Sequence, residues 1–298
     1  DGRSHEVYST GLRTPNGMGM SPDGRPLVSD NQGNWIPASK ISLGKPGAFH
    51  GVFPAINTNG PGKQTREDFD QPVIWMPQSL DSSSGGQLWL DDDRFGPLAG
   101  RYLHTSFGKG WMYVLMVEDL GDVAQAGIYR LPFQFDAGLQ RLRTNPSDGQ
   151  VYTVGLSGWQ GPGGGADGCL QRLRYTGKPS SMLLESNARP GRVELTFSAP
   201  LNRELSLSKD NYRAKRWNYL WTRNYGSDHY SLLSPGQKGE DNVSITSLEL
   251  SADGKTLSVG LADLVPVHQL MLEFDLLGAD GKPVTEQLYM TINRIPED

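Results

Sequence analysis

A short stretch near the N-terminus places chemically versatile residues at both ends of a predicted strand pair. Arg13 stands just before the apolar run 18–20, and the polar run Asp30-Asn-Gln32 follows the apolar run 26–29. The turn Ser21-Pro-Asp-Gly24 separates the two runs. Loops at strand ends are where an all-β scaffold presents a site. The stretch is therefore either the rim of a site or one more hairpin of the scaffold.

Candidate metal ligands lie in the same stretch. The run Asp30-Asn-Gln-Gly-Asn34 offers the oxygen ligands that calcium prefers. Asp and Asn are also ordinary turn-forming residues, so the run equally suits a plain loop. A second acidic run, Asp91-Asp-Asp93, is better explained as a solvated turn between two strands, because a run of charges alone is weak evidence for a metal site.

Composition narrows the classes of function. The chain has 298 residues and a net charge of −5, which argues against a nucleic-acid surface. Its single cysteine, Cys169, permits no intrachain disulfide and no cysteine-based zinc or haem motif. No apolar run reaches membrane-spanning length. The opening turn dipeptide Asp1-Gly2 runs straight into a predicted strand, so we expect a mature or excised piece with sequence missing upstream.

Short β-type runs recur along the chain with Pro, Gly and Asp between them, which predicts an all-β fold. Over residues 1–178 the units repeat about every 40–50 residues, as in four-stranded propeller blades, and predict about four blades. After a break near residues 177–181, the runs over 182–298 alternate apolar and polar residues and predict an Ig-like β-sandwich. In the first part the expected strands include residues 18–20, 26–29, 73–76, 86–90, 101–105, 111–115, 127–131, 140–143, 151–154 and 170–175.

The densest aromatic and basic segment is Lys215–Tyr225. Its aromatic faces could stack on sugars or mediate docking. In a sandwich that abuts a propeller, such a segment more often fills the interface between the two parts, and we favour that interpretation.

An ordered series of motifs resembles the glucose/sorbosone dehydrogenase family, whose members are six-bladed propellers. It begins with GLRTPNG at 11–17, the turn at 21–24 and VSDNQG at 28–33, and closes with GKPGAFHGVFP at 44–54. The resemblance continues in LHTSFGKG at 103–110, and it covers about residues 5–177 in all. The segment 158–177 resembles a divergent branch associated with planctomycete-type membrane-bound dehydrogenases. The part after it is similar to bacterial Ig-like domains.

The resemblance implies binding of pyrroloquinoline quinone (PQQ) and calcium. Arg13 falls on the arginine at the quinone carbonyl, where it would stabilise the charge that develops as hydride arrives. Asn16 falls on a glutamine that helps to hold the cofactor. Lys109 falls on an arginine that pairs with the cofactor carboxylates, and lysine supplies the charge without the bidentate fork.

For calcium, the resemblance implies a site in the same loop. Gly33 falls on a glycine whose carbonyl binds the ion, and Asn34 replaces the proline beside it. Asp30 completes the predicted metal ligands.

The family's general base is a histidine two to three blades upstream, in a region that this chain does not contain. His50 and His104 do not match that motif, and His104 suits a structural role in a β-type run.

The leading hypothesis is a PQQ- and calcium-dependent sugar or alcohol dehydrogenase module, secreted or periplasmic. It would act on a carbohydrate or small alcohol and pass electrons to an external acceptor such as a cytochrome. One alternative is a non-catalytic extracellular protein that binds a glycan or a protein partner. A third is a propeller-type glycoside hydrolase with carboxylates from Asp30 and Asp91–Asp93, whose separation the sequence does not give.

Overall fold

Strands make up most of the computed structural model, which describes residues 2–52, 69–157, 166–284 and 287–297. The helices described are short: α1 spans Arg203–Ser206, and the 3₁₀ turns η2 and η3 span Asp93–Leu98 and Lys209–Asn211. None of these described helices is long and apolar enough to cross a membrane. The prediction of an all-β fold is confirmed.

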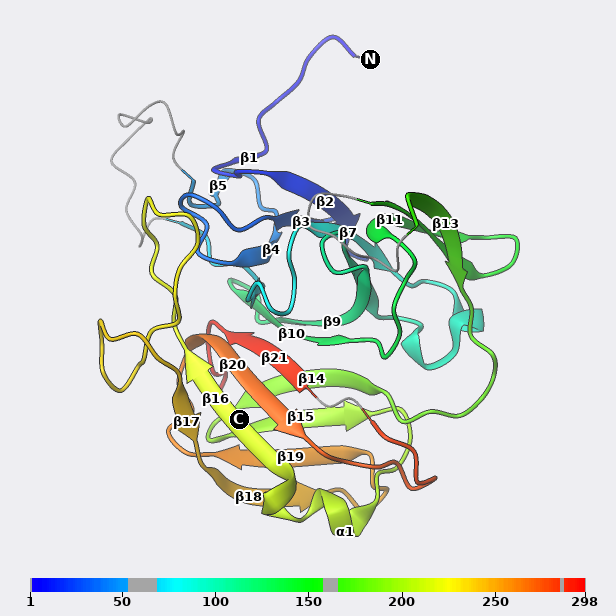
Figure 1. Cartoon of the computed structure of the whole chain (residues 1–298), viewed down its shortest axis with the longest axis vertical. Coiled ribbons are helices and arrows are strands. Elements are labelled where there is room, and N and C mark those ends of the chain that lie inside the picture. The colour runs from blue at the N-terminus through cyan, green and yellow to red at the C-terminus, as the bar shows by residue number, and fades with distance from the viewer. Residues whose placement is uncertain (1, 53–68, 158–165, 285–286, 298) are drawn as a thin grey trace.

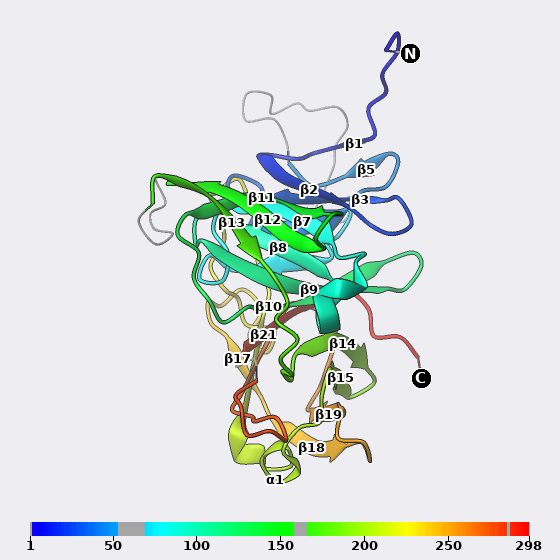
Figure 2. The same ribbon diagram turned by 90° about the vertical axis from the view of Figure 1, so that its right-hand side faces the viewer.

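The first part of the chain forms propeller-like antiparallel sheets set side by side (Figures 1 and 2). One sheet has the strand order β2-β3-β4-β6, another has β11-β12-β13, and between them β7-β8-β9-β10 belongs to a larger sheet. A small parallel pair, β1 with β5, lies beside the first sheet. The strands are β1 Ser9–Thr10, β2 Pro15–Met20, β3 Pro26–Asp30, β4 Ser39–Leu43, β5 Ala48–Phe49, β6 Ile74–Met76, β7 Ser84–Trp89, β8 Tyr102–Ser106, β9 Trp111–Asp119, β10 Ala124–Arg130, β11 Gly138–Asn145, β12 Gln150–Leu156 and β13 Gly168–Leu173.

The described residues up to 178 thus form three blade-like sheets rather than the four that the spacing predicts. Residues 53–54 of the fourth family-like motif and 158–165 of the divergent-branch segment lie outside the described residues.

Glycine lets the inner strands of neighbouring sheets approach closely. A Cβ atom on Gly17 of β2 would lie 1.6 Å from the carbonyl oxygen of Gly85 on β7. The Ser29 hydroxyl donates to that same carbonyl at 2.7 Å. Only a residue without a side chain fits at such a distance, so Gly17 fixes how the first sheet stacks on the second.

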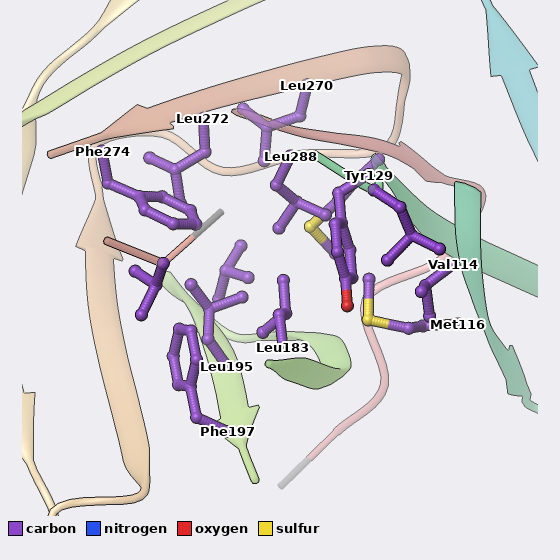
Figure 3. Close-up of a cluster of buried hydrophobic side chains, with 14 of the residues drawn as sticks. Val114, Met116, Tyr129, Leu183, Leu195, Phe197, Leu270, Leu272, Phe274 and Leu288 are labelled. Carbon is purple, nitrogen blue, oxygen red and sulfur yellow. The ribbon is translucent and has the colours of Figure 1, made fainter. Parts of the chain in front are cut away.

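The second part of the chain forms two facing sheets. One has the order β14-β15-β19-β18, and the other contains β17-β16-β20-β21. Their inner faces share one apolar core, seen in Figure 3, where Leu195 and Phe197 lie opposite Leu272 and Phe274. The strands are β14 Leu183–Arg189, β15 Arg192–Phe197, β16 Tyr212–Trp217, β17 Asp241–Val243, β18 Ile245–Leu250, β19 Thr256–Leu261, β20 Val267–Phe274 and β21 Gln287–Ile292.

One sheet joins the two parts. Strand β21 pairs with β10, with Ile128 opposite Tyr289, so eight strands run continuously from β17 to β7. The apolar core follows this connection, since Val114, Met116 and Tyr129 pack with the sandwich side chains (Figure 3). The sequence pattern changes near residues 177–181, but the eight-stranded sheet contains strands from both sides of that point. The division into 1–178 and 182–298 therefore stays a prediction, and so does the Ig-like type of the sandwich.

Candidate functional site

The Asp30 carboxylate ties the start of β2 to the end of β3. It is fully buried and accepts backbone N–H bonds from Arg13 at 2.8 Å and Thr14 at 2.7 Å. It also accepts one from Asn31 at 3.0 Å. Both carboxylate oxygens are thus engaged, and the loop that carries Arg13 is held in one place.

The Arg13 side chain is positioned by the loop opposite. Its Nη1 donates to the Gln32 carbonyl at 3.2 Å and to the Thr14 hydroxyl at 3.1 Å. The guanidinium lies against Gly33, where an added Cβ would be 2.1 Å from the Arg13 Cζ. Tyr225 contributes its ring at 5.2 Å from that Cζ, within cation–π range. Nε and Nη2 make no hydrogen bond within the described residues, so one edge of the guanidinium is available to a ligand.

Asn16 bridges the inner strands of three sheets. Its amide nitrogen donates to the Ser84 carbonyl at 3.0 Å and to the Gln140 side chain at 3.1 Å. Its amide oxygen accepts from Arg141 at 3.3 Å. Both polar atoms of the Asn16 amide are hydrogen-bonded. In this arrangement Asn16 therefore links strands β2, β7 and β11.

Lys109 lies at the same end of the second sheet, in the turn after β8. Its backbone N–H donates to the hydroxyl of Ser106, which pairs with Ser84 across β7 and β8. The half-buried side chain places Nζ 5.6 Å from the centre of the Trp111 ring and makes no hydrogen bond to a described residue. The ammonium group is therefore available.

The structure brings these predicted residues to one rim. Asn31, directly after Asp30, accepts the Ser84 N–H at 2.6 Å, and Ser84 contacts Asn16 and pairs with the strand that leads to Lys109. We call the loops around Arg13, Asn16 and Lys109 the basic rim. Arg141 also belongs to it through its contact with Asn16, and no sequence motif distinguishes Arg141 from the other arginines of β11 and β13.

The predicted calcium ligands are engaged in bonds of their own. The Gly33 carbonyl accepts N–H bonds from Ile36 at 3.1 Å and Gly226 at 3.0 Å. Asn34 donates its amide to the Arg223 carbonyl at 2.9 Å, and Asp30 already accepts three N–H bonds. Among the residues described, no group of three or more His, Cys, Asp or Glu side chains could hold a metal ion. As arranged, Gly33, Asn34 and Asp30 do not fit a calcium ion.

A second polar cluster lies inside the sheet that follows the rim. The Asp81 carboxylate accepts from the Ser84 hydroxyl at 2.5 Å and contacts His104 Nε2 at 2.9 Å. The other ring nitrogen of His104 lies 3.0 Å from the Gln87 amide nitrogen. These four side chains, the closed network hereafter, are at most 1 % exposed. His104 is fully buried and both of its ring nitrogens have a partner, as expected for a structural histidine.

Buried Lys40 and His50 lie beside the rim. The Lys40 ammonium donates to the His50 carbonyl and lies 5.5 Å from the Trp75 ring centre. Burial lowers the pKa of Lys40 to about 8, although Asp30 and Asp70 oppose the shift. Burial, and then the Lys40 charge, lower the pKa of His50 to about 4. Neither ring nitrogen of His50 finds a partner among the described residues.

The C-terminal aromatic segment packs on the first sheet. Trp221 donates its indole N–H to the Gly51 carbonyl at 2.8 Å, and its ring centre lies 4.7 Å from that of Trp35. Gly226 bonds to Gly33, and Tyr225 reaches Arg13. The interpretation of this segment as an interface is confirmed. Its contribution of Tyr225 to the rim is not visible in the sequence, because the two residues lie more than 200 positions apart.

The carboxylates of the proposed hydrolase are not brought together. Asp30 is linked through Asn31 to Ser84 at the start of β7, whereas Asp91–Asp93 follow Trp89 at its end. Six residues of strand span about 17 Å, well beyond the separation of a catalytic carboxylate pair. Asp92 is instead paired with Arg94 at 2.6 Å.

No protein-family model and no curated protein matches the chain. Among solved structures, it is similar to one described as an oxidoreductase (glucose dehydrogenase) from Thermus thermophilus, at 21% identity and a TM-score of 0.42, over 56% of this chain and 46% of that one. It is also similar to the PQQ-bound aldose sugar dehydrogenase of Streptomyces coelicolor, at 19% identity and a TM-score of 0.40, over 56% and 45%. For the soluble aldose sugar dehydrogenase of Escherichia coli the values are 19% and 0.35, over 50% and 43%. The chain spans less than half the length of each of these proteins.

Proposed function

We propose that this chain is the quinone-binding part of a sugar or alcohol dehydrogenase, with PQQ held at the basic rim. The observation that carries the proposal is the state of Arg13. Its loop is fixed by Asp30, its guanidinium is seated on Gly33, and one edge of that guanidinium makes no bond within the described residues. A cation that is held in place yet left with unused donors is suited to bind an anionic ligand.

Two cations of the rim match an anionic quinone. Arg13 would donate to the quinone oxygen and stabilise negative charge there, and Lys109 would pair with a carboxylate as a point charge. Tyr225, 64% exposed, would flank the ligand from the C-terminal part of the chain. Asn16 would act indirectly, by holding the inner strands in register.

PQQ, when bound, supplies the two-electron acceptor that the side chains lack. The residues of the rim bind and orient it. Electrons would leave to an external acceptor such as a cytochrome. A secreted or periplasmic location, a carbohydrate or small alcohol substrate, and the planctomycete-type branch belong to the same proposal.

Calorimetric titration with PQQ tests the proposal, in parallel runs with calcium and with a chelator. We expect saturable binding near one PQQ per chain. Because the predicted calcium oxygens are already bonded, we expect binding to survive chelation. If PQQ binds neither with calcium nor with the chelator, the proposal is contradicted and the non-catalytic alternative is favoured.

A further inference from the structure

A second cleft lies between the blade-like sheet and the sandwich, at the far end of β7 from the basic rim. Trp89 and Tyr102 form one side, and residues 184–187 of β14 form the other. Its volume is about 270 Å³. Figure 2 shows β14 running beside β9 at this junction. Strand β7 separates the cleft from Ser84 by about 17 Å, so it is distinct from the rim.

An aromatic ring faces one side of this cleft. Trp89 is half-buried, and its ring meets Tyr102 edge-on with centres 4.8 Å apart, so the indole is held in a fixed orientation. Its Nε1–H makes no hydrogen bond to a described residue. A fixed indole with an unused donor offers both an apolar surface and a polar contact to a ligand.

The opposite wall supplies polar groups that are likewise unused. The half-buried Asn187 amide makes no hydrogen bond within the described part of the chain, and so can both donate and accept. Glu185 uses one carboxylate oxygen to bind Arg101 at 3.0 Å, which leaves the second oxygen as an acceptor. Arg101 also donates from Nε to the Leu184 carbonyl and from Nη1 to the Gly100 carbonyl, so each of its three side-chain nitrogens makes a hydrogen bond.

The charge of the cleft selects an uncharged ligand. Its one cation, Arg101, and its one anion, Glu185, are paired with each other, and the other lining residues are neutral. A charged ligand would have to disrupt that pair or bind without a counter-charge. A volume below the roughly 300–1000 Å³ of sites for drug-sized ligands favours one ring rather than a chain.

We propose that this cleft binds a neutral sugar, as a single ring or the end unit of a glycan. The ring's C–H face would lie on Trp89, and its hydroxyls would bond to the Asn187 amide, the free Glu185 oxygen and the Trp89 N–H. The site does not depend on the quinone proposal, and its test needs no cofactor.

The test is a titration of the full chain, without quinone, with D-glucose, D-galactose, D-mannose and N-acetylglucosamine, and with D-glucuronate as the charged probe. Heat of binding and tryptophan fluorescence are followed together. We expect saturable binding of at least one neutral sugar, and weaker binding of glucuronate.

Two variants locate the site. Asn187→Ala should weaken binding about tenfold by removing hydrogen bonds. Trp89→Leu should weaken it at least as much, while Trp89→Phe, which keeps a ring, should weaken it less. The matched control is Asn242→Ala, because Asn242 is an exposed strand asparagine of the sandwich without a side-chain bond to a described residue. Thermal melting of each variant reports folding.

The proposal is overturned if no neutral sugar binds, if binding is unchanged in both Asn187→Ala and Trp89→Leu, or if glucuronate binds more tightly than glucose. Loss of binding in Asn242→Ala to the same degree as in Asn187→Ala would also overturn it.

Discussion

The closed network and the basic rim both contain polar side chains and both contact Ser84, but they differ in whether those side chains are open to a ligand. In the closed network, Asp81, His104 and Ser84 bond to one another away from solvent. At the rim, the Arg13 guanidinium is held through Nη1, while Nε and Nη2 make no hydrogen bond within the described residues. A Ser, His and Asp set therefore stabilises the fold here, while an arginine on a loop is the better candidate for chemistry. The closed network also leaves Asp81 Oδ1 and Gln87 Oε1 without a partner among the described residues, but it buries both atoms. Unused polar atoms that a ligand can reach, as at the half-buried Arg13, therefore distinguish a site from a scaffold better than residue types do.

The largest effect is expected from opening the closed network. Asp81→Ala leaves the Ser84 hydroxyl and His104 Nε2 buried without their partner, and should lower the free energy of unfolding by about 3–5 kcal/mol. Urea denaturation measures this. Asp91→Ala, at an exposed carboxylate, is the control and should cost under about 0.5 kcal/mol. A loss below about 1 kcal/mol for Asp81→Ala would mean that the network is not structural.

The next effect concerns His50, which is buried like the network but has no partner among the described residues. Its pKa is lowered to about 4 in the folded chain, so between pH 6.5 and 4 the unfolded state binds a proton that the native state does not. Stability is full above pH 6.5 and should fall by about 3 kcal/mol as pH drops to 4.

Urea denaturation across that pH range, repeated with His50→Phe, isolates this contribution. The variant should lose that part of the pH dependence, whereas His5→Phe, at an exposed position, should not. Equal slopes for His50→Phe and the unmodified chain would show that His50 protonates freely when folded.

Arg13→Ala tests whether the basic rim binds a ligand. Loss of a charge-assisted hydrogen bond should weaken PQQ binding about 10- to 100-fold, with little change in stability. Arg25→Ala is the control, because Arg25 is paired with Asp23 and Asp119 at the other end of β2 and β3. Similar losses in both variants would point to a general charge effect instead of a site.

Gly33→Ala tests whether the position of the Arg13 guanidinium matters, because it changes the surface on which the guanidinium lies and leaves the charge of Arg13 in place. A Cβ there would meet the guanidinium at 2.1 Å and displace it, so PQQ binding should weaken by about tenfold. Gly168→Ala is a suitable control, since its nearest contact would be an ordinary 3.4 Å. Unchanged affinity in Gly33→Ala would show that the observed position of Arg13 is not the binding one.

The smallest effect is expected at Lys109. Because Lys109 is only half-buried and would act as a point charge, Lys109→Ala should weaken PQQ binding only a few-fold, and less at high salt. Lys109→Arg should retain or improve binding, because a guanidinium can donate two parallel hydrogen bonds to a carboxylate. Calorimetry at two salt concentrations measures both, with Lys282→Ala as the distant control. Unchanged affinity in Lys109→Ala at low salt would exclude Lys109 from the site.

The sequence predicted most strands because alternation and turn residues are local signals, as in the runs that became β3, β8 and β12. Strands β4 and β16 were missed because polar residues interrupt their apolar pattern. Lys40 in β4 is nevertheless fully buried, since a carbonyl and the Trp75 ring receive its ammonium. Tertiary contacts of this kind leave no trace in a local pattern.

For the site, motif order placed Arg13, Asn16 and Lys109 in one neighbourhood, and the structure brings them to one rim. The sequence could not show that Asn16 spends its amide on three strands, or that Gly33 gives its carbonyl to Gly226. It also could not join Tyr225 to Arg13 or continue β10 into β21. These are long-range pairings, and only the folded chain specifies them.

The most direct test of the account is the calorimetric titration of the unmodified chain with PQQ beside Arg13→Ala. The account predicts saturable binding near one per chain, weakened at least tenfold in the variant and retained in the presence of a chelator. Absence of saturable binding, or equal affinity in the two proteins, would contradict it.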